Sequence, residues 1–69
     1  MTHSIKRIAR DYSALSDLRQ DEKRFNESDF IRFAFDNIDK YDLFEDAGDL
    51  LVTTWYCNDL INDYRKTIQ

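Results

Sequence analysis

Residues 49–68 read DLLVTTWYCNDLINDYRKTI, and two patterns overlap within them. Apolar or small side chains recur at spacings of four and three residues, which is typical of one face of an α-helix. Basic residues close the stretch, where the negative end of a helix dipole favours cations. We therefore predict a helix that starts near Asp46–Asp49 and runs to the end of the chain. Its apolar stripe consists of Leu50, Thr54, Cys57, Ile61, Tyr64 and Ile68, widened by Leu51 and Trp55.

The same stretch also contains a run of strand-forming residues. Val52–Cys57 is rich in β-branched and aromatic side chains, and Phe30–Phe35 is aromatic enough for a strand as well. A short antiparallel pair of these two segments is the alternative to the helix. We favour the helix because the three–four spacing continues to Ile68 and no tight hairpin signal such as Asn-Gly occurs.

The first part of the chain predicts an amphipathic helix over Ser4–Gln20. Its apolar residues recur every three or four positions, and its basic residues fall on the opposite face. The polar residues 21–24 are interpreted as the connection to the next element. The apolar face comprises Ile5, Ile8, Tyr12 and Leu15, and the basic face comprises Lys6, Arg7 and Arg10.

A middle helix is predicted to begin after Asn26 or Ser28, because either residue is a favourable N-cap. Glu27 and Asp29 then lie close to the positive end of the helix dipole. We expect this helix to end somewhere in Lys40–Phe44.

Together these elements predict a single domain over residues 1–69 with an all-α fold, a compact bundle of three to four short helices. An α+β fold with a short antiparallel strand pair is the minor alternative. Sixty-nine residues are near the lower limit for an unaided hydrophobic core, and Cys57 is the one cysteine, so no internal disulfide can help. Ten aromatic residues, each able to bury roughly 150–250 Å², favour dense packing instead.

The residue inventory argues against an enzyme and against a cofactor or metal site. The chain has one glycine, so loops with several glycines that cradle phosphates are excluded. His3 is the sole histidine and lies in a terminal segment, and Cys57 belongs to the apolar stripe. The clustered carboxylates lack the spacing and the glycine of a calcium-binding EF-hand loop. We expect no catalytic residue, no bound metal and no cofactor.

The sequence predicts a cytoplasmic protein. The longest run without a charged residue is Leu50–Asn58, far short of the roughly 20 residues that span a bilayer. The N-terminal residues are basic but lack the apolar region of a secretory signal. A single cysteine also fits a reducing compartment.

The strongest functional signal is the separation of charge along the chain. Residues 25–63 hold ten of the fourteen acidic residues and only Arg32 and Lys40 in opposition, whereas residues 1–24 hold six basic and four acidic residues. A self-repelling acidic block suggests a basic partner. The expected acidic face comprises Asp29, Asp36, Asp39, Asp42, Glu45, Asp46 and Asp49, with Tyr56, Asp59 and Asp63 as a second patch. Val52 and Leu60, interleaved with the second patch, are expected to pack against the N-terminal helix or a second copy.

In size, acidity and lack of catalytic groups, the chain resembles the small DNA-mimic inhibitors encoded by phages and mobile elements, such as antirestriction and some anti-CRISPR proteins. The resemblance covers the whole chain and is compositional, so it transfers no residue by motif. It implies a protein that occupies the nucleic-acid channel of a defence complex, such as a CRISPR effector subunit or a restriction enzyme, and blocks its binding to DNA. The inhibitor itself would be a monomer or a homodimer.

Two other functions remain open on the sequence. One is a homodimeric transcription-regulating or interaction module that touches DNA through Lys6, Arg7 and Arg10. The other is an immunity or antitoxin protein that neutralises a basic toxin, which would rely on the same charge attraction and differ only in its partner.

Overall fold

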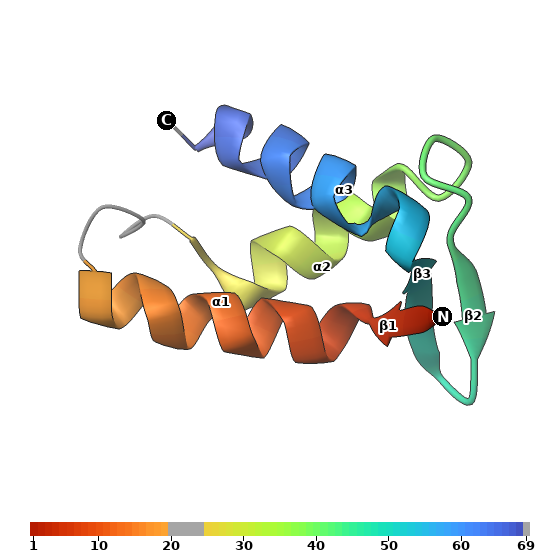
Figure 1. Ribbon diagram of the computed structural model, residues 1–69, viewed down its shortest axis with the longest axis horizontal. Coiled ribbons are helices and arrows are strands. Elements are labelled where there is room, and N and C mark those ends of the chain that lie inside the picture. The colour runs from red at the N-terminus through yellow and green to blue at the C-terminus, as the bar shows by residue number, and fades with distance from the viewer. Residues whose placement is uncertain (20–24, 69) are drawn as a thin grey trace.

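The computed structural model describes residues 1–19 and 25–68 and shows an α+β fold (Figure 1). The all-α prediction is therefore wrong. The predicted connection at residues 21–24 lies outside the described residues. The elements follow in the order β1 (Thr2–Ser4), α1 (Ile5–Arg19), α2 (Glu27–Asp36), β2 (Phe44–Asp46), β3 (Asp49–Thr53) and α3 (Thr54–Thr67).

The three strands form one antiparallel sheet with β3 in the middle, in the order β1-β3-β2. His3 lies opposite Val52, and Glu45 lies opposite Leu50. Leu50 and Val52 are buried while the residues on either side of them are half-buried, which is the period of two expected for a strand covered on one face. The alternative strand pair was also misplaced, because Phe30–Phe35 is helical and the partners of β3 are β1 and β2.

A two-residue turn at Ala47 and Gly48 joins β2 to β3, where the sequence predicted the start of a helix. Both residues have positive φ, 52° for Ala47 and 80° for Gly48, as the type I′ turn that suits a twisted hairpin requires. Glycine adopts such angles without steric cost, whereas alanine does not. Gly48 therefore marks a hairpin and not a helix start.

Helix α3 begins at Thr54, so the ambiguous segment Val52–Cys57 is divided between two elements. Val52 and Thr53 end β3, and the residues that follow are helical. The side chain of Thr53 makes no capping hydrogen bond. Instead, the backbone N–H of Thr54 donates to the carbonyl of Met1 at 3.0 Å, and its hydroxyl donates to the same oxygen at 3.1 Å. The first residue of the chain thus fixes the start of the last helix.

The other two helices agree better with the sequence. Helix α1 covers the predicted segment to within one residue at each end, and Asn26 is the N-cap of α2, its side chain accepting from the N–H of Asp29 at 3.1 Å. The predicted end of α2 was too late. The helix stops at Asp36, where the side-chain amide of Asn37 donates to the carbonyl of Phe33 at 2.7 Å, and a turn leads into β2.

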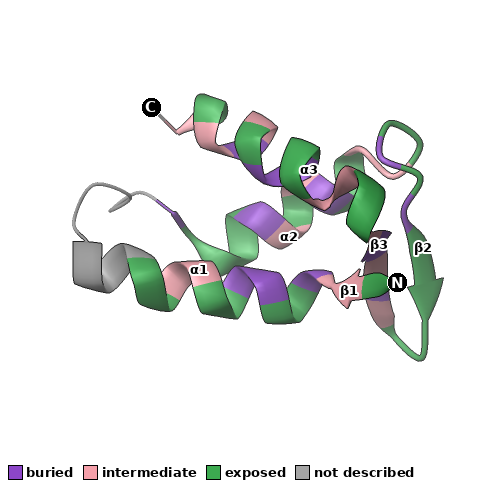
Figure 2. Cartoon of the chain, viewed as in Figure 1, coloured by how far each residue is buried: buried purple, intermediate pink, exposed green. Residues whose placement is uncertain are grey.

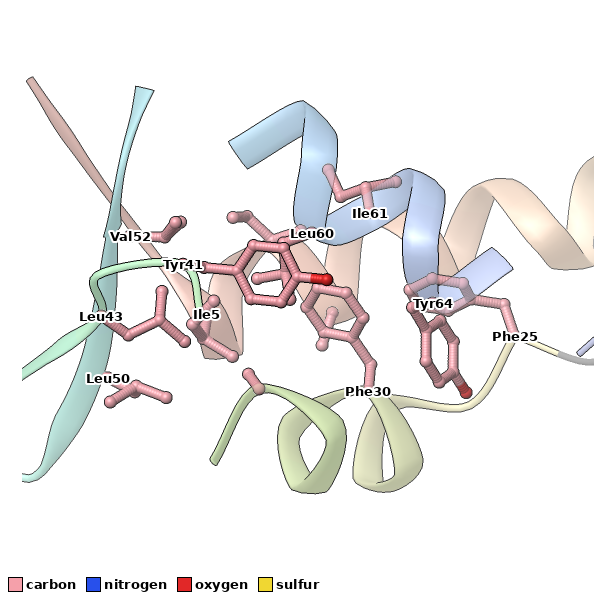
Figure 3. Close-up of a cluster of buried hydrophobic side chains, with 13 residues drawn as sticks. Ile5, Phe25, Phe30, Tyr41, Leu43, Leu50, Val52, Leu60, Ile61 and Tyr64 are labelled. Atoms are coloured by element: carbon pink, nitrogen blue, oxygen red, sulfur yellow. The ribbon is translucent and has the colours of Figure 1, made fainter. Parts of the chain in front are cut away.

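The core lies between the sheet and the helices (Figure 3). Leu43, Leu50 and Val52 line its sheet side, while Phe25, Phe30 and Tyr64 form an aromatic cluster farther along the helices. The Tyr64 ring centroid lies 5.1 Å from that of Phe25 and 5.3 Å from that of Phe30, both edge-on, a geometry that aromatic quadrupoles favour. Val52 and Leu60 are wholly buried in this core and not in the second patch.

The sheet stands at one end of the molecule, and all three helices extend from the same side of it (Figure 1). The molecule measures 32 × 20 × 19 Å. This arrangement leaves the opposite side of the sheet, together with the β2–β3 hairpin, at the surface of that end.

Candidate partner-binding surface

Most of the uncompensated charge of the chain lies in residues 39–49, called here the acidic hairpin segment. It comprises the end of the turn after α2, strand β2, the two-residue turn and the first residue of β3. Five acidic residues oppose Lys40, a balance of −4 that equals the net charge of the whole chain, because the rest holds nine acidic and nine basic residues. Asp39, Asp42, Glu45 and Asp46 are exposed, and Figure 2 shows β2 exposed throughout.

Asp49 differs from these four residues because it has a structural role. Its half-buried carboxylate accepts a hydrogen bond from the hydroxyl of Ser4 and another, at 2.8 Å, from the N–H of Leu50. Asp49 therefore ties β1 to β3. The ammonium group of Lys6 lies 3.4 Å from the carbonyl of Gly48, so one cation of α1 borders the hairpin turn.

Asp29 and Asp36 lie at opposite ends of α2 and are exposed. Both border a shallow surface hollow of about 350 Å³, and Arg32 lies between them in the same hollow. Asp36 immediately precedes the turn that leads to the acidic hairpin segment. Asp29 lies two helical turns earlier and is separated from that segment. The seven residues of the expected acidic face are thus divided: five lie in the acidic hairpin segment, and Asp29 and Asp36 lie on α2.

The second patch also forms a hollow, of about 310 Å³, in which its acidic residues lie beside cations. Asp59 and Asp63 line it together with Lys40 and Lys66. Asp63 accepts a hydrogen bond from the phenol of Tyr41 and lies 3.8 Å from the ammonium group of Lys40. The hydrogen bond from Tyr41 lowers the pKa of Asp63, and burial, followed by the effect of Asp63, raises the pKa of Tyr41 to about 12. Asp63 is thereby neutralised within the molecule.

The sequence indicated Tyr56 as the aromatic residue of the binding surface, but other aromatic residues are more exposed. Tyr56 is half-buried and packs against the core, whereas its neighbour Trp55, predicted to widen the apolar stripe, is 85% exposed. Phe44 on β2 is 44% exposed. Trp55 is exposed because strand β3 replaces the start of the predicted helix, and Phe44 is exposed on β2, a strand that the sequence did not predict.

The basic residues Lys6, Arg7 and Arg10 are exposed on α1, and Ile5 and Ile8 are buried. The amphipathic division predicted for this helix is therefore confirmed for Ile5, Ile8 and the half-buried Tyr12, whereas Leu15, predicted on the apolar face, is 39% exposed. The basic surface belongs to the helical part of the molecule, whereas the acidic hairpin segment belongs to the sheet end.

Other chemical groups give no further site. Cys57 is half-buried, and burial raises the pKa of its thiol, which disfavours the reactive thiolate. Among residues 1–19 and 25–68, no three His, Cys, Asp or Glu side chains gather so that they could hold a metal ion. None of the described helices combines the length and the apolarity needed to cross a membrane.

Comparison of the chain with protein-family models, with curated proteins and with solved structures finds no match in any of the three.

Proposed function

We propose that this chain is a non-enzymatic inhibitor that binds a basic, nucleic-acid-binding protein through the acidic hairpin segment and blocks its access to DNA. The observation that carries the proposal is the charge of residues 39–49, where four exposed acids and one exposed lysine give a balance of −3 at the end of the molecule that the helices leave uncovered. A cleft that attracts phosphates is attracted to such carboxylates by the same long-range field.

The hairpin holds three of these charges, Glu45, Asp46 and Asp49, in a defined arrangement. β2 is paired along its length with β3, and Leu50 and Val52 anchor β3 in the core. Four of the acidic residues are aspartates, whose short side chains keep the carboxylate close to the fixed backbone. A preorganised set of charges loses less conformational entropy on binding than a flexible acidic tail, so it can compete better with a nucleic acid.

The proposed mechanism is competition. The acidic hairpin segment enters the basic channel of the partner and occupies positions that phosphates would take, so the partner no longer binds its target DNA. The compositional resemblance to phage-encoded DNA mimics suggests that the partner is a defence component, such as a CRISPR effector subunit or a restriction enzyme. A basic toxin would satisfy the same electrostatics, and the identity of the captured protein separates the two roles.

Capture from a lysate of the native host, followed by a displacement assay, tests this function. The immobilised chain is expected to retain a basic protein that elutes as salt rises, because exposed charge attractions weaken over a Debye length of roughly 8–10 Å. The captured protein should bind DNA alone and release it when the chain is added in excess. Simultaneous binding of the chain and DNA to that protein would contradict competition.

The exposure of Lys6, Arg7 and Arg10 on one helix favours one second candidate, direct DNA binding. Under the proposed function, the chain should fail to retard duplex DNA in a gel-shift assay at low salt, because its net charge is −4. Retardation that disappears when these three residues are replaced by Gln would instead support the DNA-binding module.

A further inference from the structure

The sheet has an outer face that the helices do not cover. Along β3, Leu50 and Val52 are 1% and 0% exposed and point into the core, whereas Asp49, Leu51 and Thr53 are half-buried on the other side. Residues directly opposite in antiparallel strands share a face. Leu51 lies opposite both Ser4 and Phe44, so these three residues form a row across the outer face of all three strands.

This row places an apolar pair beside two carboxylates. Phe44, 44% exposed, and Leu51 form a cross-strand pair in the half of the sheet nearest the β2 edge. Asp46 and Asp49 form the next pair on the same face, because Asp46 lies two residues after Phe44 and Asp49 lies two residues before Leu51. Asp49 is engaged by Ser4, and Asp46 is exposed. The outer face therefore offers an apolar contact bordered by an available negative charge.

A second copy of the chain is a poor occupant for this face. Face-to-face association of two copies would bring two acidic hairpin segments, each of −4, close together. Like charges in contact oppose association. A partner with basic side chains removes this repulsion and forms complementary pairs.

We infer that the outer face of the sheet is the docking site for a basic segment of the partner, with an apolar side chain placed on Phe44 and Leu51 and an arginine or lysine placed on Asp46. This inference rests on the proposed function and adds to it the apolar contact and its location. Charge attraction then brings the partner to the sheet end, and burial of the apolar pair slows its release.

Two peptides of equal charge test the inference. Acetyl-Arg-Ser-Arg-Leu-Arg-Ser-Arg-amide carries one apolar residue, and the matched peptide has Ser in place of Leu. Each is labelled with a fluorophore, and its dissociation constant is measured by anisotropy with the full-length chain. Burying a leucine contributes at most about 1.5–3 kcal/mol, so the Leu peptide is expected to bind about tenfold more tightly.

The same measurement with two variants locates the contact. Phe44→Ser should bring the ratio of the two dissociation constants close to one, whereas Trp55→Ser, which removes an exposed aromatic residue elsewhere, should leave the ratio unchanged. Circular dichroism verifies that both variants fold.

The outcomes separate this inference from the proposed function. Equal binding of the two peptides, with no effect of Phe44→Ser, would overturn the apolar docking site and leave the charge attraction intact. Failure of both peptides to bind would overturn the attraction to basic segments as well. A dimer of the unmodified chain in sedimentation velocity that Phe44→Ser dissociates would show that a second copy occupies the face, which also overturns the inference.

Discussion

At the scale of single residues, Ala47 in the β2–β3 turn has a φ of 52°, a left-handed conformation that is unfavourable for alanine. The sequence Ala47-Gly48 lacks the asparagine that marks many type I′ turns, and the acidic residues around it resemble a helix start. The positive φ of Ala47 is the feature that only the structure reveals. An L-residue with a Cβ adopts this conformation at a cost of roughly 1 kcal/mol or more.

Replacing Ala47 with Asn should therefore stabilise the protein by about 0.5–1 kcal/mol, because asparagine tolerates the left-handed conformation better and completes an Asn-Gly turn. Urea denaturation measures the change, and Ala47→Val, which is disfavoured at positive φ, should destabilise. If Ala47 instead lay in a helix, Asn would lower the stability, since alanine has the higher helix propensity.

The contact between Tyr41 and Asp63 gives a pH dependence. The folded chain holds the phenolic proton of Tyr41 until its pKa of about 12, whereas the unfolded chain releases it near the ordinary value of 10.0. The unfolded state thus binds fewer protons between these values, so the contribution of Tyr41 to stability should be complete below pH 10 and fall as pH rises toward 12.

Denaturant unfolding at several pH values from 8 to 12 measures this loss of stability. In Tyr41→Phe, the loss should be smaller but still present, because burial also raises the pKa of Tyr64. Identical alkaline profiles for the two proteins would contradict the assigned role of Tyr41.

At the scale of elements, the junction of β3 and α3 explains why the fold class was predicted wrongly. The stripe from Leu50 through Thr54 to Cys57 has helical spacing by coincidence, because Leu50 belongs to a strand of period two and Cys57 to a helix. β1 has no apolar alternation of its own, and its pairing with β3 joins residues about 50 positions apart. Local periodicity cannot reveal such a tertiary pairing.

The elements with strong local signals were predictable. Helix α1 has a clear apolar face, and the side chain of Asn26 caps α2 as its residue type suggests. Arg65 and Lys66 lie in the last turn of α3, where the dipole favours cations. The sequence therefore predicted helices well and failed where short strands depend on distant partners.

Two alanine substitutions distinguish the strand from the predicted helix. Val52 is 0% exposed and its neighbour Leu51 is half-buried on the outer face, so Val52→Ala should cost about 2 kcal/mol of unfolding free energy and Leu51→Ala about half of that or less. A continuous helix would reverse this order, because it places Leu51 on the apolar stripe and Val52 opposite. Chemical denaturation of both variants decides between them.

At the scale of the whole molecule, the fold determines which carboxylates are engaged within the molecule and which are exposed. The sequence gives a block of −8 over residues 25–63 without showing which carboxylates act together. In the folded chain Asp63 is paired with Tyr41 and Lys40, and Asp49 is bonded to Ser4. Of the eight other acids in this block, four are exposed in the acidic hairpin segment and four are exposed on α2 and α3. Contacts between residues far apart in the sequence decide which carboxylates are engaged and which stay exposed.

The affinity of the captured partner for two charge-reversed variants tests the central claim most directly. Glu45→Lys with Asp46→Lys reverses two exposed acids of the hairpin, and Asp11→Lys with Glu27→Lys makes the same change in net charge on the helices. We expect that the hairpin variant, still folded by circular dichroism, loses at least about tenfold in affinity and part of its salt dependence, while the helix variant changes severalfold at most. Equal losses in the two variants, or none in the hairpin variant, would contradict the central claim.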